Sequence, residues 1–560
     1  MDITIRIAGE AGQGLQTTGD LLVRVFTRLG LHVFSTQSYL SRIRGGLNWC
    51  DIRIEDKELF SGREQADLLV ALNKDALDEL RDQVTEGGMI LFNGSAESGI
   101  LGVDFSAIAK ELVGSAVMAN SVAAGAIIEL LGYDIEELCR FLEVTFKKKG
   151  DEIIQNNVKC ARQGAAMVSS QAGHIAAPKP TGSPECVCTG GEALGLGAAT
   201  AGVSFATAYP MTPGTAVLTY LAGVSDEYGI TVEQAEDEIA AVNMVCGAVY
   251  AGAVAMTTTS GGGFALMTEG VSLAGMMELP IVIHIAQRPG PATGLPTRTA
   301  QQDLKMVLYA GHGEFPRAIY TPGTLRQAYD LMRRAFETAH KYQSPVFILS
   351  DEFLVDIQKN IEPLDKIRRP IVQYIVEEAG PDYQRYTVTP DGISPRAVPG
   401  GEALVICDSD EHSESGHITE DLAARIRQQD KRMAKGKGIL AEVIPPEVYG
   451  PAEATHLLVC WGSTYGPCRE AVDRLNSGEP NFAMVHFSQV WPIDVEKVKK
   501  ILTPQGLDSS LRKITFVEGN VTAQMASVLR EQGIHLDCDT LLRYDGMPFS
   551  GEEIARRIEK

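Results

Sequence analysis

Several features that mark other classes of protein are absent from this chain of 560 residues. No apolar run approaches the length of a membrane span, and the start, Met1–Ile7, lacks the basic residues and apolar core of a signal peptide. Basic residues are scarce, because 50 Lys and Arg stand against 72 Asp and Glu for a net charge of −22. We therefore expect a cytoplasmic protein that binds neither nucleic acid nor an anionic membrane surface.

Clustered cysteines are also missing. The ten cysteines are scattered and include no Cys-x-x-Cys pair, so we expect reduced thiols and no iron–sulfur cluster in this chain. Cys186 and Cys188 lie closest together, but a single intervening residue is poor spacing for metal ligands, and plain thiols are the better interpretation. The length of the chain allows three or four domains.

Short apolar segments that alternate with helical patterns predict α/β domains. Ala253–Thr258 and Pro280–Ala286 read as buried strands of a parallel sheet. Between them, Ser260–Gly263 forms a bare loop that opens a helix near Phe264. Because loops at the carboxyl ends of parallel strands hold ligands in open α/β sheets, we expect a site at Arg288–Thr297.

The chain begins with a strand, a glycine-rich loop and a helix. Ile3–Ile7 alternates as a strand, Gly9–Gly14 reads Gly-Glu-Ala-Gly-Gln-Gly, and a second strand begins at Leu31. This is a βαβ unit, whose helix N-terminus is suited to an anion. The glycine spacing is not the dinucleotide fingerprint, and no acidic residue ends the second strand. The loop either cradles a phosphate group or is a tight turn with close helix–sheet packing.

Two arginines follow in Arg42-Ile-Arg44-Gly-Gly46. They would suit a polyphosphate or a carboxylate, although a solvated loop with unrelated charges explains them equally well. The segment as a whole resembles the gamma domain of 2-oxoacid:ferredoxin oxidoreductases, in which a Gly-x-Gly-Gly-Gln-Gly loop and a later Arg-Gly-Gly recur. This resemblance implies that CoA is associated with the domain, through Gly9, Gly12, Gln13, Gly14 and Arg44.

Two further motifs stand before the central loop. Prolines stiffen Tyr209-Pro-Met-Thr-Pro213, so Thr212 either donates to a substrate carboxylate or caps the following helix. Glu236-Asp237-Glu238 precedes an apolar helix. An acidic residue at a helix N-terminus is stabilised by the helix dipole, whereas one that points inward would be a functional carboxylate.

Together with the Pro/Gly loop at Arg288–Thr297, these motifs resemble the alpha domain of the same family, which has a transketolase-like fold. The resemblance implies that Thr212, Arg288 and Thr297 bind the 2-oxoacid. It also implies that Glu238 is catalytic and contacts the aminopyrimidine of thiamine diphosphate. A glutamate hydrogen-bonded to N1′ would favour the imino tautomer, which can take the C2 proton. Arg288 would make the stronger, charge-assisted bond to the substrate carboxylate.

The histidines give weaker signals. His284 lies inside a strand and His312 in Gly-His-Gly, and packing is the better expectation for both. His412 and His417 stand among acidic residues, which invites the hypothesis of a metal site. Their spacing does not support it, so we expect a polar loop before the basic helix at Arg425–Lys437 and no metal site.

The predicted fold class is α/β and multidomain. A Rossmann-like gamma domain is followed by a transketolase-like thiamine-diphosphate-fold domain and a domain similar to the transketolase C-terminal domain. The expected boundaries are 1–163 for the gamma domain, 164–190 for a linker, 191–355 for the alpha domain, 356–402 for a connection and 403–560 for the last domain.

Two parts of the family pattern are missing, namely a Gly-Asp-Gly motif for Mg²⁺ and diphosphate and the cysteines for a [4Fe–4S] cluster. The resemblance implies that a separate beta subunit carries both, in an αβ heterodimer or its dimer. The enzyme would convert a 2-oxoacid and CoA to acyl-CoA and CO₂ and pass electrons to ferredoxin. We expect 2-oxoglutarate as substrate, because the gamma–alpha fusion resembles that subgroup, with pyruvate or a branched-chain 2-oxoacid as alternatives. A non-catalytic CoA- or nucleotide-binding protein and a non-oxidative thiamine decarboxylase are the rival classes.

Overall fold

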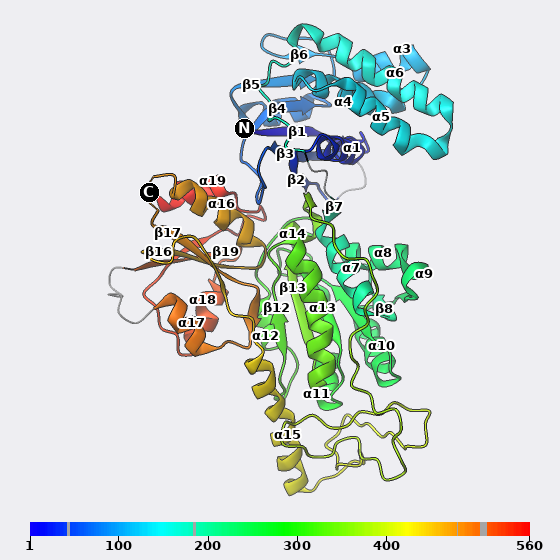
Figure 1. Cartoon of the computed structure of the whole chain (residues 1–560), viewed down its shortest axis with the longest axis vertical. Coiled ribbons are helices and arrows are strands. Elements are labelled where there is room, and N and C mark those ends of the chain that lie inside the picture. Colours follow the sequence, from blue (N-terminus) through cyan, green and yellow to red (C-terminus); the bar gives the residue numbers. More distant parts are fainter. Residues whose placement is uncertain (42–44, 183–185, 479, 504–511) are drawn as a thin grey trace. The chain divides into compact units, whose positions relative to one another are not determined.

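A computed structural model of the protein describes residues 1–41, 45–182, 186–478, 480–503 and 512–560 (Figure 1). The chain divides into two compact units. Unit 1 comprises Met1–Cys188, Ile357–Pro363 and Ser550–Glu553, and unit 2 comprises Thr189–Asp356, Leu364–Phe549 and Ile554–Lys560. Both units are α/β, as the sequence predicts. Within the described ranges, no helix has the length and apolar character needed to cross a membrane.

An eight-stranded mixed sheet forms the centre of unit 1, in the order β6-β5-β4-β1-β3-β2-β14-β7. Its strands are β1 (Asp2–Ala11), β2 (His32–Ser38), β3 (Gly45–Glu55), β4 (Ala66–Ala71), β5 (Val84–Phe92), β6 (Leu101–Gly102), β7 (Cys186–Thr189) and β14 (Gln358–Ile361). β1 pairs in parallel with β4, whereas β3 is antiparallel to both β1 and β2. The predicted βαβ unit is therefore present, but an antiparallel strand separates its two strands.

The helices of unit 1 pack closely where small residues face each other. They are α1 (Leu15–Arg28), α2 (Lys74–Leu80), α3 (Phe105–Val113), α4 (Ala119–Leu130), α5 (Ile135–Phe146) and α6 (Asp151–Val168). A Cβ atom at Gly164 of α6 would lie 2.0 Å from the carbonyl oxygen of Val122 of α4, so glycine is required there. Within the segment 164–190, expected to be a linker, residues 164–168 belong to α6, residues 186–189 form β7, and Gly190 begins the next helix, α7 (Gly190–Ala201). Glycine and alanine that look like linker residues thus serve helix packing.

A seven-stranded sheet forms the larger layer of unit 2, in the order β18-β12-β13-β11-β10-β8-β9. Its strands are β8 (Phe205–Ala208), β9 (Thr231–Gln234), β10 (Ala255–Thr259), β11 (Val282–Gln287), β12 (Ala318–Tyr320), β13 (Val346–Asp351) and β18 (Gln489–Trp491). All neighbouring pairs are parallel except β12 and β18. The carboxyl ends of β8, β10 and β11 therefore lie side by side at one edge of the sheet.

Helices flank this sheet, and Figure 1 labels most of them. They are α7 (Gly190–Ala201), α8 (Thr215–Gly223), α9 (Ser225–Tyr228), α10 (Glu238–Tyr250), α11 (Gly261–Met276), α12 (Leu304–Leu308), α13 (Leu325–Tyr342) and α14 (Glu352–Asp356). One apolar core joins Val242 of α10 and Phe264 of α11 to Ile283 of β11 and to Trp461 of the smaller layer. This shared core fixes α10 and α11 against the sheet that carries the candidate site.

A five-stranded sheet, in the order β15-β17-β16-β19-β20, forms the smaller layer of unit 2. Its strands are β15 (Glu447–Tyr449), β16 (His456–Trp461), β17 (Phe482–Phe487), β19 (Lys513–Glu518) and β20 (Asp539–Leu542). The helices of this region are α15 (Leu422–Ala441), α16 (Tyr465–Leu475), α17 (Val495–Leu502), α18 (Gln524–Glu531) and α19 (Gly551–Ile558).

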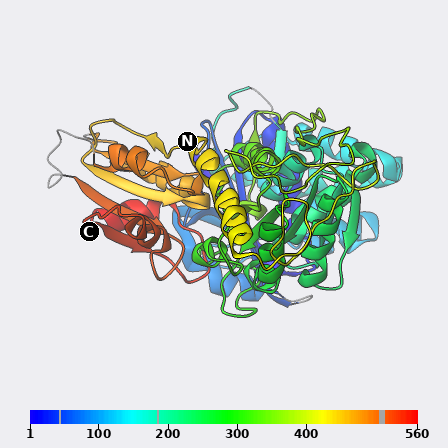
Figure 2. The same ribbon diagram turned by 90° about the horizontal axis from the view of Figure 1, so that it is seen from below.

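Between β14 and α15 the chain forms neither a helix nor a regular strand over residues 364–421, which we call the irregular segment. Figure 2, seen from below, shows α15 (yellow) at the boundary between the helices of the seven-stranded layer (green) and the five-stranded layer (orange). The irregular segment is held by side-chain contacts and by isolated backbone hydrogen bonds, such as those from the N–H groups of Arg369 and Ile371 to the carbonyl oxygens of Thr200 and Ala201.

Candidate active site

Three loops meet at the carboxyl edge of the seven-stranded sheet. Tyr209–Gly214 follows β8, Ser260 follows β10, and the loop beginning at Arg288 follows β11. Because β8, β10 and β11 are parallel neighbours, the three loops share one edge. The sequence-predicted site segments are thus brought together by the sheet topology.

A direct hydrogen bond joins two of the predicted substrate residues. Nη1 of Arg288 donates to the backbone carbonyl oxygen of Thr212 at 2.6 Å. Arg288 is half-buried, and burial lowers its pKa while the nearby charge of Glu238 raises it. The guanidinium therefore remains a cation that faces a carboxylate group across the site.

The three consecutive acidic residues before α10 have separate positions. Glu236 is exposed, and Oδ1 of Asp237 caps the helix by accepting from the backbone N–H of Ala240 at 2.7 Å. Glu238, the first residue of α10, is only 3% exposed. Burial and the neighbouring Asp237 raise the pKa of the Glu238 carboxyl, and Arg288 opposes this shift. One acid of the three thus points inward, as a functional carboxylate would.

Glu238 Oε1 is buried, and no group in the described part of the chain donates a hydrogen bond to it. It lies against the first turn of α11, where a Cβ atom at Gly263 would be 2.4 Å away. The hydroxyl of Ser260, the fully buried N-cap of that helix, likewise has no partner among the described residues. An unsatisfied buried polar group costs about 1–3 kcal/mol. These atoms are therefore available to the donors and acceptors of a ligand.

A second acidic side chain, which the sequence reasoning missed, lies near the same turn. Oδ2 of Asp303 would be 2.2 Å from a Cβ atom at Gly261 and has no hydrogen-bond partner among the described residues. Burial raises the pKa of Asp303 to about 6. Its backbone N–H donates to Oε1 of Gln287 at 2.9 Å. The only local signal was its position just before α12, which indicates a helix cap rather than a site.

His284 is buried, and the expectation that it packs in the core is confirmed. Its Nδ1 lies 2.7 Å from the hydroxyl of Thr258, and its Nε2 lies 2.8 Å from the hydroxyl of Ser350. Burial lowers the pKa of His284 to about 3, so the ring is neutral. The Thr258 hydroxyl donates to the carbonyl oxygen of Gly214 at 2.9 Å. Through Thr258, the histidine therefore supports the loop that contains Thr212.

The loop after β11 is anchored to the five-stranded layer through Gln301. Its Nε2 donates to the carbonyl oxygen of Trp461 at 2.7 Å, and its Oε1 accepts from the N–H of Gly519 at 2.9 Å. Asn520 Nδ2 donates to the Gln301 carbonyl oxygen at 2.9 Å. The predicted residue Thr297 lies in this anchored loop and is 8% exposed.

In unit 1, the Gly9–Gly14 loop is a compact turn that precedes α1. Gly12 and Gly14 have φ values of 94° and 81°, which favour glycine. Gln13 Oε1 accepts from the N–H of Glu10 at 2.8 Å and from Asn73 Nδ2 at 3.2 Å. Gly12 and Gln13 are exposed at the N-terminus of α1, so both the phosphate cradle and the tight turn remain open. Arg44 lies outside the described residues.

The remaining polar motifs have packing partners. The ring of His412 stacks on Tyr386 at 3.8 Å between centroids, and its Nδ1 lies 3.0 Å from the carbonyl oxygen of Asp410. His417 Nδ1 lies 3.0 Å from the hydroxyl of Ser415. In the described ranges, no three His, Cys, Asp or Glu side chains gather as a metal site would require.

Two protein-family models match the chain. The model described as pyruvate flavodoxin/ferredoxin oxidoreductase, thiamine diphosphate-binding, matches residues 196–431. The model described as pyruvate ferredoxin/flavodoxin oxidoreductase matches residues 4–167. Both matches agree with the resemblance found in the sequence.

Known proteins resemble the chain over its whole length. A 2-oxoacid:ferredoxin oxidoreductase subunit alpha of Sulfolobus sp is 30% identical, over 99% of this chain and 96% of that protein. The 2-oxoglutarate oxidoreductase subunit KorA of Mycobacterium tuberculosis is 28% identical, over 100% of this chain and 91% of that protein.

A solved structure is similar too. The 2-oxoglutarate:ferredoxin oxidoreductase from Magnetococcus marinus, with 2-oxoglutarate, coenzyme A and succinyl-CoA bound, superimposes with a TM-score of 0.91 at 31% identity, over 100% of this chain and 99% of that one. This likeness confirms the predicted multidomain α/β fold.

Proposed function

The chain belongs to the 2-oxoacid:ferredoxin oxidoreductases, and on that premise we propose that it oxidatively decarboxylates 2-oxoglutarate together with a separate beta subunit. The products would be the acyl-CoA and CO₂, with ferredoxin as electron acceptor. The observation that carries the proposal is the buried Oε1 of Glu238, which has no hydrogen-bond partner among the described residues, near the linked pair Arg288 and Thr212.

The residues fit thiamine diphosphate. When bound, this cofactor supplies the nucleophilic carbon and the electron sink for decarboxylation. Glu238 would hold the ring nitrogen N1′ of its aminopyrimidine, because Oε1 is buried and unoccupied by any donor in the described chain. The raised pKa of Glu238 suits a group that shares a proton with that nitrogen. Mg²⁺, the diphosphate and the [4Fe–4S] cluster are assigned to the beta subunit.

Arg288 would bind the 1-carboxylate of the substrate. Thr212 engages Nη1 of its guanidinium, and the other N–H groups of the side chain, which have no hydrogen bond within the described ranges, could form a charge-assisted pair with a carboxylate. The hydrogen bond to the Thr212 carbonyl also fixes the side chain in one orientation, which lowers the entropy cost of binding. The Thr212 hydroxyl and Thr297 would complete the substrate contacts.

The edges of the site would be covered by the beta subunit. Each site segment carries an exposed large apolar side chain, namely Tyr209, Ile239, Leu266 and Leu295. Exposed apolar groups around a polar centre are typical of a surface that a partner protein covers. Such a partner would exclude water from Glu238.

Unit 1 would bind CoA at the N-terminus of α1, through Gly9, Gly12, Gln13 and Gly14. The exposed turn leaves the first N–H groups of α1 open to a phosphate. The proposed contact of Arg44 with CoA rests on the sequence motif alone. Support for 2-oxoglutarate comes from the names of the Mycobacterium and Magnetococcus proteins; pyruvate and branched-chain 2-oxoacids are the alternatives.

The test is to purify the full chain with its associated subunits and to measure CoA-dependent reduction of an electron acceptor with each 2-oxoacid. We expect 2-oxoglutarate to give the highest kcat/KM. A preparation that contains thiamine and iron but prefers pyruvate would overturn the substrate. A preparation that binds CoA without turnover of any 2-oxoacid would favour the non-catalytic alternative.

A variant of Arg288 sharpens the test. R288Q should raise the KM for the 2-oxoacid by roughly 100-fold, from the loss of a charge-assisted pair, and R288K should recover part of it. R326Q, which alters an exposed arginine of α13, is the control. An unchanged KM in R288Q would remove Arg288 from the substrate site.

A further inference from the structure

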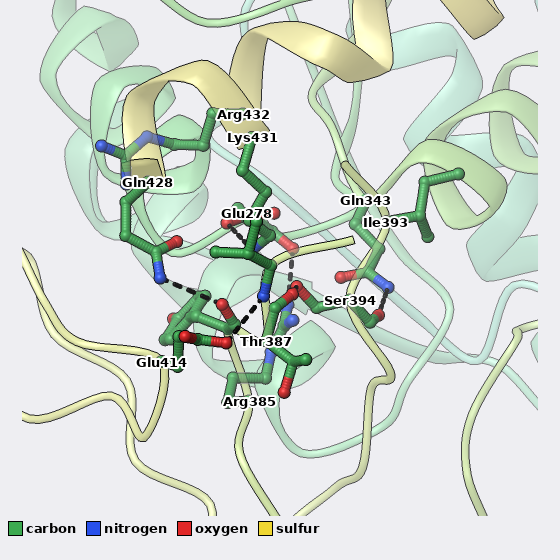
Figure 3. Close-up of polar contacts among 12 residues, drawn as sticks. Glu278, Gln343, Arg385, Thr387, Ile393, Ser394, Glu414, Gln428, Lys431 and Arg432 are labelled. Carbon is green, nitrogen blue, oxygen red and sulfur yellow. Dashed lines mark hydrogen bonds and ion pairs between the residues drawn. The ribbon is translucent and has the colours of Figure 1, made fainter. Parts of the chain in front are cut away.

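Far from the site loops, a group of buried charged side chains surrounds Glu278 (Figure 3). Glu278 follows α11 and is 1% exposed. Nζ of Lys431 lies 2.7 Å from its Oε1, and Nζ of Lys435 contacts its Oε2. Arg385 and Arg396 are buried in the same region, and all four cations are 2% exposed. We call these four cations and Glu278 the buried charge cluster.

Three of the cations bind the carboxyl ends of helices. Nη2 of Arg396 donates to the carbonyl oxygen of Val249 in the last turn of α10 at 2.6 Å. Nη2 of Arg385 donates to the carbonyl oxygen of Glu278, just after α11, at 3.0 Å. Nζ of Lys435 donates to the carbonyl oxygen of Gln343, the C-cap of α13, at 3.0 Å. The carboxyl end of a helix carries about half a negative charge, so these three helix ends compensate the charge of the cations only in part.

The nearby carboxylates are already engaged. Glu411 pairs with Arg432, and Glu414 Oε2 accepts from the backbone N–H of Val388 at 2.9 Å. Glu278 thus faces three of the four cations, Lys431, Lys435 and Arg385. Burial of an uncompensated charge costs several kcal/mol. The cluster therefore holds more positive than negative charge, and a further negative charge would stabilise it.

The unsatisfied atoms point to where that charge belongs. Nη1 of Arg385 and Nη1 of Arg396 are both buried and have no acceptor among the described residues. Each guanidinium uses Nη2 for a helix end, as described above. In the described structure, the Nη1 group of each arginine is therefore available to a hydrogen-bond acceptor.

Hydrogen bonds hold the chain around Arg385 beside the chain around Arg396. The Tyr383 hydroxyl donates to the carbonyl oxygen of Pro395 at 3.0 Å and accepts from the N–H of Ala397 at 2.8 Å. The Ser394 hydroxyl donates to the carbonyl oxygen of Thr387 at 2.8 Å. Tyr383 also stands two residues before Arg385 in the chain. The two guanidinium groups repel each other. Burial, together with the charge of Arg385, lowers the pKa of Arg396 to about 10.

We propose that Arg385 and Arg396 bind a small monovalent inorganic anion, of the size and charge of chloride, through their unpartnered Nη1 groups. A water molecule could accept both hydrogen bonds but would leave the positive charge uncompensated. The anion must be small, since both side chains are enclosed. It would fasten the irregular segment to the carboxyl ends of α10 and α11.

The test is thermal unfolding of the full chain at constant ionic strength, with chloride replacing gluconate, an anion too bulky for an enclosed site. Ligand binding to the native state alone raises the unfolding midpoint. We expect a rise of at least about 2 °C that saturates with chloride concentration, and bromide should give the same result. A flat response, or one that grows without saturation, would overturn the proposal.

Variants separate the site from surface effects. R396Q should lose the halide response. The control R369Q alters an exposed arginine of the same segment, which pairs with Asp365, and should keep the response. A halide response that persists unchanged in R396Q would assign the anion elsewhere.

Diffraction decides even if R396Q does not fold. Crystals of the unaltered protein grown in bromide should show anomalous scattering between the two guanidinium groups. A water molecule at that place, without an anomalous signal, would overturn the proposal.

Discussion

The two ends of α10 and α11 are opposite in composition. At the amino ends lie a buried acid, Glu238, and a buried hydroxyl, Ser260, each with a polar atom that has no partner in the part of the chain that the structure describes. At the carboxyl ends lie the cations of the buried charge cluster, two of which donate to backbone carbonyls of these helices. Each end matches the sign of the helix dipole. The amino ends are arranged to be completed by a ligand, whereas the carboxyl ends fix the irregular segment, so charge changes should affect activity at one end and stability at the other.

The largest expected effect is at the amino end of α10. E238Q should lower kcat by about 10²–10⁴-fold, because an amide cannot exchange a proton with the cofactor ring. The unfolding midpoint should stay within about 2 °C of the unaltered protein. Turnover is measured in the purified complex, with E236Q as control since Glu236 is exposed. Equal kcat values for E238Q and E236Q would contradict the assignment.

At the carboxyl end, E278Q should reduce the free energy of unfolding by roughly 3–5 kcal/mol, because Lys431 and Lys435 would be left without their carboxylate. The midpoint of denaturant unfolding measures this loss, and E377Q, an exposed acid of the irregular segment, is the control. Activity per folded molecule should be retained. If E278Q unfolds like E377Q, the cluster does not stabilise this end.

The pH dependence of stability gives a third, smaller effect. Burial lowers the pKa of Lys435 to about 8, compared with about 10.4 for an unfolded chain. Between these values the unfolded state binds more protons, so the free energy of unfolding should rise with pH from about 8 to about 10.4, by roughly 2 kcal/mol. The K435M variant should show a shallower slope in urea unfolding across this window. A slope that is the same in both proteins would mean that Lys435 titrates normally.

The smallest effect concerns the hydrogen bonds of Thr258, which hold the loop that contains Thr212. T258V removes the hydrogen bond to the Gly214 carbonyl and the contact with His284. Loosening of the Thr212 loop should raise the KM for the 2-oxoacid by about 5- to 10-fold, equivalent to roughly 1 kcal/mol. T268V is the matched control, because the Thr268 hydroxyl donates only within α11, to the carbonyl oxygen of Ala265 at 3.2 Å, in the described structure. If the two variants share one KM, the hydrogen-bonded histidine has no part in positioning the loop.

Much of the fold follows from local patterns. The apolar run Pro280–Ala286 predicts a strand that is found as β11, and the helix expected near Phe264 is found as α11. The short strands β7 and β14 were not predicted. Each has four residues without clear alternation, and their pairing with distant strands in the sheet of unit 1 leaves no local signal.

The candidate site was partly predictable. The motif that contains Thr212 and the later Arg288 indicated the two loops, and the structure joins these residues by a hydrogen bond. The local pattern does not show which of three adjacent acids points inward, because the helix dipole favours all of them, and only the family resemblance singled out Glu238. Asp303 was missed because its proximity to Gly261 arises from tertiary packing.

The buried charge cluster had no sequence signal. Arg385 and Arg396 lie in a proline-containing segment without periodicity, where charged residues are normally exposed. Their burial depends on the carboxyl ends of helices more than 100 residues away in the chain. Contacts between residues so far apart in the chain leave no local pattern from which they could be predicted.

The anchoring of Gln301 has a consequence for how this gene can be rearranged. If residues 403–560 were encoded as a separate product, the two products would have to reassemble before Gln301 could regain Trp461, Gly519 and Asn520. Chimeras between relatives should therefore inherit residues 288–303 and 456–520 from the same parent.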